Sequence, residues 1–387
     1  MQQSASDQPQ NAEIDPADPM WEQLLTITGA SGLTVNGDNP YDPQVHNADL
    51  ASRIFSQGMI ALGESYMDRW WDCEELDDMM TRGMVDGNHK NLWNKRKMVI
   101  QILKARLYNF QKKSLAFEVG EKHYDIGNDL FEKMLDPTMC YSCGYWKDAS
   151  TLEEAQRAKM DLVCRKAGLE KGMRVLDIGC GWGSLAEYAT KNYGVEVTGI
   201  TVSKEQKKLA EERCAGLPVN FVLQDYRDLT GSYDRIISIG MFEHVGLKNY
   251  ETYFQKCHEL LGEGGKFVLH TIGTNRSHKM MDPWIKKYIF PGGKIPSLAQ
   301  ISSAQEKFFV IEDVQNFGPD YDRTLVAWRE NFIASYDSLK DKYDERFYRM
   351  WMFYLNASAA SFRARYNQLF QLVLSKSYSP DRYDSPR

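Results

Sequence analysis

Apolar residues recur at two different spacings along this chain, and each spacing predicts a different kind of element. Beyond Gly172, short runs rich in Val, Ile and Leu alternate with stretches in which apolar residues recur every three or four positions. Strands separated by helical stretches are typical of a doubly wound parallel sheet, so this part is predicted to be an α/β domain. The predicted strands are 174–178, 196–200, 219–224, 234–239 and 266–272, and the predicted helices between them are 184–193, 204–215 and 250–261.

Two later segments, 308–317 and 368–376, have the pattern of further strands. Between them lies an aromatic-rich stretch, 324–366, which we expect to be a helical insertion. The whole pattern therefore predicts a sheet with a core of five parallel strands, which the two later strands complete.

The N-terminal part of the chain has a helical pattern instead. Residues 1–18 are polar and are predicted to form a disordered tail. We predict a small, mainly helical domain over 19–115, with two short helices in 60–84 and a longer one in 95–113, and assign 116–387 to the α/β domain. The helix at 95–113 carries a basic cluster beside its apolar stripe. That cluster is either a solvated face of its own domain or a surface for anionic lipid.

Length, charge and cysteine usage narrow the classes of protein. The 387 residues suit about two domains, and 43% hydrophobic residues are enough for a substantial core. A net charge of −6 argues against binding nucleic acid through its phosphates. No apolar run approaches the roughly 18 residues of a membrane-spanning helix, and we expect no secretory signal.

Seven cysteines, an odd number, are expected to be reduced thiols. Cys140 and Cys143 lack the further ligands of a zinc site, so no metal is predicted.

A glycine-rich stretch, "VLDIGCGWGSLA" at 175–186, connects the first predicted strand of the α/β domain to its helix. Its spacing is G-x-G-x-G, which differs from the G-x-G-x-x-G of dinucleotide-binding proteins. Asp177 stands at the end of the strand, where its carboxylate would repel a pyrophosphate and suit a ligand with an ammonium or sulfonium charge. The stretch therefore indicates S-adenosylmethionine rather than a nicotinamide cofactor or ATP.

The other strands carry polar residues at their carboxyl ends, where ligands bind in such sheets. Thr201, Ser203 and Gln206 follow the second strand and can bond a ribose. Asp225 follows the third strand, with Tyr226 beside it. Its carboxylate either accepts from an adenine amino group or forms a turn.

The fourth and fifth strands end in residues that can move protons. Glu243 and His244 follow the fourth strand, and His270 ends the fifth. A carboxylate and an imidazole at neighbouring strand ends form a proton-handling pair beside the cofactor. We interpret His244 as a supporting residue at a helix start, and His270 taken alone could equally be a buried core histidine.

Eight segments, in this order and over nearly the whole chain, resemble cyclopropane fatty acid synthases. They are "HYDIGNDLFEKMLD", "YSCGYW", "VLDIGCGWG", "GITVSKEQ", "QDYRDL", "SIGMFEHVG", "LHTIG" and "NFGPDY". The resemblance includes an N-terminal domain that the shorter mycolic-acid members of the family lack. It implies the Rossmann-like fold of S-adenosylmethionine-dependent methyltransferases. It also implies transfer of a methylene group from S-adenosylmethionine across a cis double bond of an unsaturated phospholipid acyl chain, with bound bicarbonate as base.

The resemblance also implies roles for individual residues. The bicarbonate cage maps onto Cys143, Glu243, His270, the backbone of Ile272, and Tyr321. The cofactor contacts map onto Tyr141, Ser142, Asp177, Gly179, Cys180, Gly181, Trp182, Gly183, Thr201, Gln206, Asp225 and Tyr226. The chain departs from the family at Ser358, where many relatives have cysteine. A covalent thiol mechanism through that position is therefore excluded.

We expect a cytoplasmic homodimer that binds peripherally to the inner face of the cell membrane and has no nucleic-acid partner. The segment 282–297 combines aromatic residues with lysines. It either inserts shallowly into a membrane or packs as an ordinary loop on the catalytic domain. As the membrane contact we favour this segment over the basic helix at 95–113, because it directly follows the fifth strand. Three other functions stay open: a methyltransferase for a soluble acceptor, a lipid methyltransferase that forms methyl-branched or hydroxylated acyl chains, and a lipid-binding module without activity.

Overall fold

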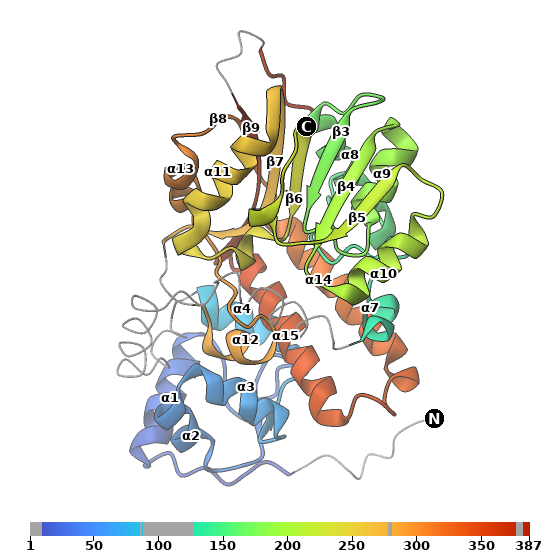
Figure 1. Ribbon diagram of the computed structural model, residues 1–387. Coiled ribbons are helices and arrows are strands. Elements are labelled where there is room, and N and C mark those ends of the chain that lie inside the picture. The colour runs from blue at the N-terminus through green and yellow to red at the C-terminus, as the bar shows by residue number, and fades with distance from the viewer. Residues whose placement is uncertain (1–9, 86, 88–126, 278–280, 377–381) are drawn as a thin grey trace. The chain divides into compact units, whose positions relative to one another are not determined.

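The computed structural model describes residues 10–85, 87, 127–277, 281–376 and 382–387 (Figure 1). The basic helix predicted at 95–113 and the domain boundary predicted at 115 lie outside these residues. The chain forms two compact units, and each is discontinuous in sequence. The helical unit consists of Met1–Lys104, Asp282–Ile289 and Tyr336–Tyr366, and the sheet unit of Ala105–Met281, Phe290–Ser335 and Asn367–Arg387. The sequence pattern predicts contiguous domains instead.

The sheet unit is built on a seven-stranded sheet with the strand order β5-β4-β3-β6-β7-β9-β8. Strands β5 to β7 in this order run parallel, and β9 and β8 pair antiparallel at one side. This confirms the predicted plan of five parallel strands and two later ones. The strands are β3 (Arg174–Ile178), β4 (Glu196–Thr201), β5 (Val219–Leu223), β6 (Tyr233–Ile239), β7 (Leu261–Thr274), β8 (Val310–Asn316) and β9 (Asn367–Ser375).

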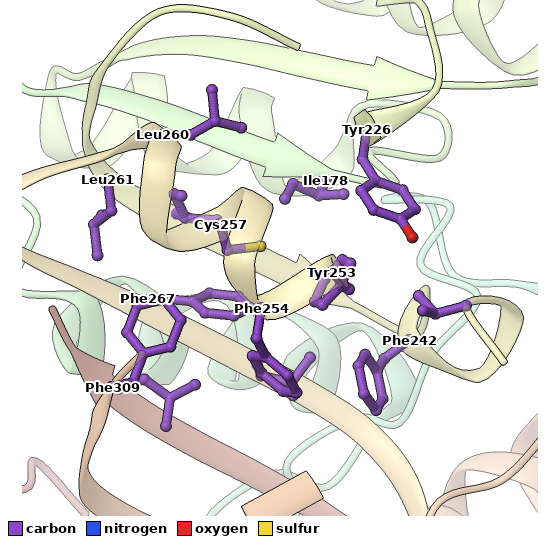
Figure 2. Close-up of a cluster of buried hydrophobic side chains, with 14 of the residues drawn as sticks. Ile178, Tyr226, Phe242, Tyr253, Phe254, Cys257, Leu260, Leu261, Phe267 and Phe309 are labelled. Carbon is purple, nitrogen blue, oxygen red and sulfur yellow. The ribbon is translucent and has the colours of Figure 1, made fainter. Parts of the chain in front are cut away.

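Both faces of the sheet are apolar, because neighbouring residues of a strand point to opposite faces and consecutive residues of these strands are apolar. One face packs on the helices α8 (Leu152–Ala167), α9 (Ser184–Tyr193) and α10 (Lys204–Arg213). Its core residues include Val175, Val197, Ile237, Val268 and Val373. Their neighbours Leu176, Ile236, Phe267, Leu372 and Leu374 lie in a second core with α11 (Tyr250–Leu260) and α13 (Leu298–Gln305). Figure 2 shows the aromatic part of this second core, where Tyr253 and Phe254 of α11 lie near Phe267.

Helix α8 has well-defined ends, which matters because it borders the site described below. The Thr151 side chain accepts from the Glu154 amide while the Glu154 carboxylate accepts from the Thr151 amide, which forms a capping box. The helix ends at Gly168, whose left-handed φ of 61° suits glycine. The remaining helices of this unit are α7 (Asn128–Met134), α14 (Gly318–Ser335) and the short turns η2 (Tyr226–Asp228), η3 (Phe242–His244) and η4 (Leu247–Asn249).

The helical unit confirms the two short helices predicted in 60–84, which are α3 (Met59–Met67) and α4 (Leu76–Val85). Both pack against α15 (Glu345–Arg363), which the sequence pattern places in the aromatic-rich insertion. Arg349 of α15 donates to the carbonyl oxygens of Tyr66 and Trp71 and is buried there. The other elements are α1 (Pro19–Ala30), α2 (Leu50–Gln57), α12 (Pro283–Tyr288), η5 (Tyr336–Ser338) and the strand pair β1 (Gln44–Val45) and β2 (Trp71–Asp72).

The prediction that 282–297 inserts into a membrane is wrong for its largest side chain. Trp284 of α12 is only 1% exposed, and its ring lies 4.6 Å from that of Phe353, centroid to centroid. A Cβ atom at Gly63 would lie 2.5 Å from the Trp284 ring, so glycine is needed there. Ile289 is buried as well. These residues belong to the core of the helical unit, where their burial removes apolar surface from water.

Among the described residues, no helix combines the length and apolar character needed to cross a membrane.

Candidate functional site

A cavity of about 220 Å³ opens in the sheet unit at the carboxyl ends of β3, β4, β5 and β6. Eleven of the twelve cofactor residues that the sequence predicts line it, and Gly183 is the exception. They are Tyr141, Ser142, Asp177, Gly179, Cys180, Gly181, Trp182, Thr201, Gln206, Asp225 and Tyr226. The strand order brings them together, because parallel strands deliver their carboxyl ends to one edge of the sheet.

The three glycines of the loop after β3 have different environments, although each has a left-handed φ. A Cβ atom at Gly181 would meet no protein atom within 4 Å, and the residue lines the cavity. A Cβ atom at Gly183 would lie 2.9 Å from the Phe221 ring, so Gly183 serves the packing of α9 on the sheet. The amides of Gly179 and Cys180 both donate to the Ile200 carbonyl, which fixes the loop against β4.

Asp177 is 2% exposed and lines the cavity, and its Oδ2 atom has no hydrogen-bond partner. Burial raises the pKa of this carboxyl to about 7, and the nearby Lys159 cation opposes the shift. A buried carboxylate without a partner is unfavourable unless a donor or cation reaches it. The cavity therefore suits a cationic ligand group at Asp177.

The side chains after β4 form a buried network. Thr201 Oγ1 donates to Gln206 Oε1 at 2.9 Å and accepts from the Ser203 amide. Because the amide oxygen of Gln206 is engaged, its NH₂ group is what Gln206 can offer a ligand.

Asp225 forms the turn that the sequence left open as one of its two roles. Its Oδ1 accepts from the Arg227 amide and so begins the turn η2. The Arg227 guanidinium also donates to both carboxylate oxygens at 2.7 Å, and both residues line the cavity.

Several residues outside the predicted cofactor contacts also line the cavity. Among them are Lys159 and Arg227, which the sequence did not single out, and His244, to which it gave only a supporting role. Burial lowers the pKa of His244 to about 4, so it is neutral, and its ring lies 6.1 Å from that of Phe290. Arg227 stands two residues after Asp225, a predicted cofactor contact, so the sequence could have marked it as a cavity residue. Lys159 lies inside an ordinary amphipathic helix, α8, and nothing in the sequence marks it as a cavity residue.

Glu243 and Ile272, two of the predicted cage residues, are in direct contact. Glu243 Oε1 accepts from the Ile272 amide at 2.6 Å, while Glu243 Oε2 is buried without a partner. Burial raises the pKa of this carboxyl to about 7. The backbone donor of Ile272 thus orients Glu243.

His270 lies on β7, directly opposite Gln371 of β9 and next to Ile239 of β6. Gln371 Nε2 is 3.3 Å from His270 Nδ1, and His270 Nε2 is buried without a partner. Burial holds the pKa of His270 well below its usual range, so the ring is neutral. When Gln371 donates to Nδ1, the ring proton is on Nε2, and His270 becomes a hydrogen-bond donor there.

Cys143 and Tyr321 are buried near Thr324 of α14. Thr324 Oγ1 accepts from the Gly144 amide at 3.1 Å and from Trp146 Nε1, which fixes the segment that carries Cys143. Burial, with the Asp320 charge, raises the pKa of the Cys143 thiol well above its usual range.

Phe317, which precedes α14, has ring contacts with His270 and with Tyr145, two residues after Cys143. Its ring lies 5.6 Å from His270 and 5.5 Å from Tyr145. None of the five cage residues lines the cofactor cavity itself.

Comparisons with known proteins show which family this chain belongs to. Residues 111–372 match the family model described as mycolic acid cyclopropane synthetase. The cyclopropane-fatty-acyl-phospholipid synthase of Escherichia coli strain K12 is 51% identical over 365 residues, which cover 94% of this chain and 96% of that protein. The tuberculostearic acid methyltransferase UfaA1 of Mycobacterium tuberculosis is 34% identical and covers 92% of this chain and 88% of its own length.

Solved structures of other proteins are similar to a large part of this chain. The mycolic acid cyclopropane synthase CmaA1, complexed with SAH and CTAB, has a TM-score of 0.64 and 35% identity. It covers 67% of this chain and 98% of its own. Coclaurine N-methyltransferase has a TM-score of 0.68 at 23% identity, a likeness of fold alone. The sheet unit thus has the fold of S-adenosylmethionine-dependent methyltransferases, and the chain belongs to the mycolic acid cyclopropane synthetase family.

Proposed function

We propose that this protein is a cyclopropane-fatty-acyl-phospholipid synthase. It transfers a methylene group from S-adenosylmethionine across a cis double bond of an unsaturated phospholipid acyl chain, and bound bicarbonate serves as base. The observation that carries the proposal is the 51% identity to the Escherichia coli synthase over 94% of the chain, which extends beyond the shorter mycolic-acid relatives. The buried groups of the site support it in detail.

The cavity fits the cofactor on two grounds. The unpartnered Asp177 carboxylate complements the cationic end of S-adenosylmethionine, which supplies an electrophilic methyl group on a sulfonium when bound. Gly181 leaves open space beside it, so a ligand can approach the backbone closely. Asp225 and Tyr226, at the end of β5, are the residues proposed for the adenosine end.

The predicted cage fits a small anion with one hydroxyl group, and bicarbonate supplies a base small enough to stand beside the lipid. Glu243 Oε2 and His270 Nε2 are buried polar atoms without partners. Glu243 accepts a hydrogen bond from the hydroxyl group, and His270 donates from Nε2 to an oxygen of the anion. Cys143, protonated because of its burial, offers a further weak donor. Ile272 acts by holding Glu243.

Aromatic side chains around the site keep water away from the reacting alkene. Methyl transfer to an isolated double bond leaves positive charge on the acyl chain, which water would quench to an alcohol. Tyr141 lies 5.1 Å from Trp328, and Trp328 lies 6.0 Å from Tyr321, between ring centroids. Such faces stabilise a nearby cation, so ring closure is favoured over hydration.

We also propose that the protein acts as a cytoplasmic homodimer bound peripherally to the inner face of the membrane. The proposed substrate lies in a bilayer, so the enzyme must meet it at the surface. Flotation with anionic phospholipid vesicles tests membrane binding, and sedimentation equilibrium tests the dimer. Protein that stays at the bottom of the gradient contradicts membrane binding. Protein that sediments as a monomer contradicts the homodimer.

A second candidate function is methylation of the alkene to a branched acyl chain, which the 34% identity to the tuberculostearic acid methyltransferase favours. The deciding experiment incubates the protein with unsaturated phosphatidylethanolamine vesicles and labelled S-adenosylmethionine. A cyclopropane product gains one CH₂ and shows ring protons by NMR. A methyl branch or a hydroxyl group in place of the ring would overturn the proposed function.

A further inference from the structure

Lys159 is a buried lysine in the wall of the cofactor cavity, and the proposed function gives it no role. Its side chain is 2% exposed, and its Nζ atom donates to Ser142 Oγ at 2.9 Å. Among the described residues, no carboxylate is close enough to form an ion pair with it. A buried cation whose only partner is a hydroxyl group is unfavourable unless a counter-charge reaches it.

The cavity thus holds two buried opposite charges that are not in contact. Asp177 and Lys159 both line it, and the Lys159 cation opposes the rise in the pKa of Asp177. The same cation acts on the pKa values of Cys143 and His270 in the predicted cage. A ligand that carries a cation and an anion a few bonds apart would satisfy both charges.

Ser142 extends this anion-binding end. Its hydroxyl oxygen accepts from Lys159, so its own proton remains available for an acceptor in the cavity. The backbone of Ser142 is fixed as well, because Gln156 Nε2 donates to its carbonyl at 2.8 Å. Gln156 and Lys159 lie three residues apart on one face of α8, whose ends are capped.

Resting on the proposed function, we propose that Lys159 is a positioning residue for the carboxylate of the cofactor's amino-acid end, acting through its charge and through Ser142. Asp177 complements the ammonium group of the same amino acid. Arg227 is less suited to this carboxylate because both oxygens of Asp225 already engage it, and His244 is uncharged.

The test compares two ligands that differ in the carboxylate alone. Calorimetry on the full chain, at about pH 8.5 so that Asp177 is ionised, uses S-adenosylmethionine and its decarboxylated analogue. For Lys159→Met we expect the Kd of S-adenosylmethionine to rise about 10- to 100-fold, as for loss of a charged hydrogen-bond donor. The Kd of the decarboxylated analogue should stay within about twofold. Lys159→Arg should restore part of the loss, and Ser142→Ala should show the same selectivity with a smaller effect.

Lys166→Met is the matched control, because Lys166 is buried in the same helix but pairs with Asp313 away from the cavity. It should lower the melting temperature and leave both Kd values unchanged. Equal weakening of both ligands by Lys159→Met, or no weakening of either, would overturn the inference alone. Failure of the wild-type protein to bind S-adenosylmethionine would overturn the proposed function as well.

Discussion

The amide of Ile272 donates to Glu243 Oε1 across 2.6 Å, and this bond decides which oxygen of the carboxylate stays available. Glu243 Oε2 is buried and has no partner. Because β6 and β7 are neighbours in the sheet, this oxygen and the unpartnered Nε2 of His270 come from adjacent strand ends. The two atoms are the structural basis of the proposed base site.

Glu243→Gln keeps the size of the side chain and removes the anion. We expect kcat to fall by about 10²-fold or more, as for loss of a positioned base. The Kd of S-adenosylmethionine should change little, because Glu243 does not line the cofactor cavity. Turnover on unsaturated vesicles and calorimetry measure the two quantities. Near wild-type turnover of Glu243→Gln would contradict the proposed bicarbonate cage.

The pH dependence of turnover follows from the same carboxyl group. Burial raises the pKa of Glu243 to about 7, and only the ionised form accepts the hydroxyl hydrogen bond. We therefore expect kcat to rise as the pH increases through about 7 and to level off above it. In Glu243→Gln this rise should be absent from the residual activity, which a pH series at saturating cofactor would reveal.

Asp177→Asn should stabilise the ligand-free protein while it weakens cofactor binding. Burial raises the pKa of Asp177 from 3.8 to about 7, so the unfolded chain releases this proton at lower pH than the folded one. Stability is then lost as the pH rises from about 4 to 7. At pH 8 the variant should gain about 1–3 kcal/mol in the free energy of unfolding. Denaturant titrations check this, and a less stable variant would contradict it.

Gln371 is expected to hold the proton of His270 on Nε2. Gln371→Leu removes the donor to Nδ1, and kcat should fall about tenfold, the value of one hydrogen bond. Gln371→Glu would accept from Nδ1–H instead, which favours the other tautomer, and kcat should fall further. Nitrogen chemical shifts of His270 identify the tautomer. Equal activity of the two variants would argue against this role.

Gly181→Ala and Gly183→Ala form a matched pair, because both residues have a left-handed φ and both variants are strained by about 1 kcal/mol. At Gly181 the added Cβ meets no protein atom, so the loss should appear as weaker cofactor binding. At Gly183 the added Cβ meets the Phe221 ring, so we expect a further loss of stability of about 1–3 kcal/mol. Thermal unfolding and calorimetry separate the two effects. A Gly181→Ala variant with wild-type affinity would show that the cofactor does not approach this loop.

The strands and the plan of five parallel strands with two later ones were predictable from the sequence, because the spacing of apolar residues records local burial. The order of the strands in the sheet was not predicted. Val175 and Leu176, for example, belong to the cores on opposite faces. The end of each strand could also be located, and parallel strands bring such ends together. The positions of Asp177, Asp225, Glu243 and His270 at these ends therefore mark them as candidates in the sequence alone.

The tertiary structure alone decided which partner each of these residues has. Trp284 fits the pattern of a membrane-inserting loop, yet it packs against Phe353 and beside Gly63, both of which are distant from it in the sequence. Lys159 fits the pattern of an ordinary helix, yet it is buried in the wall of the cofactor cavity. Spacing reports which face of an element is buried, whereas these contacts join residues far apart in sequence and depend on how whole elements pack.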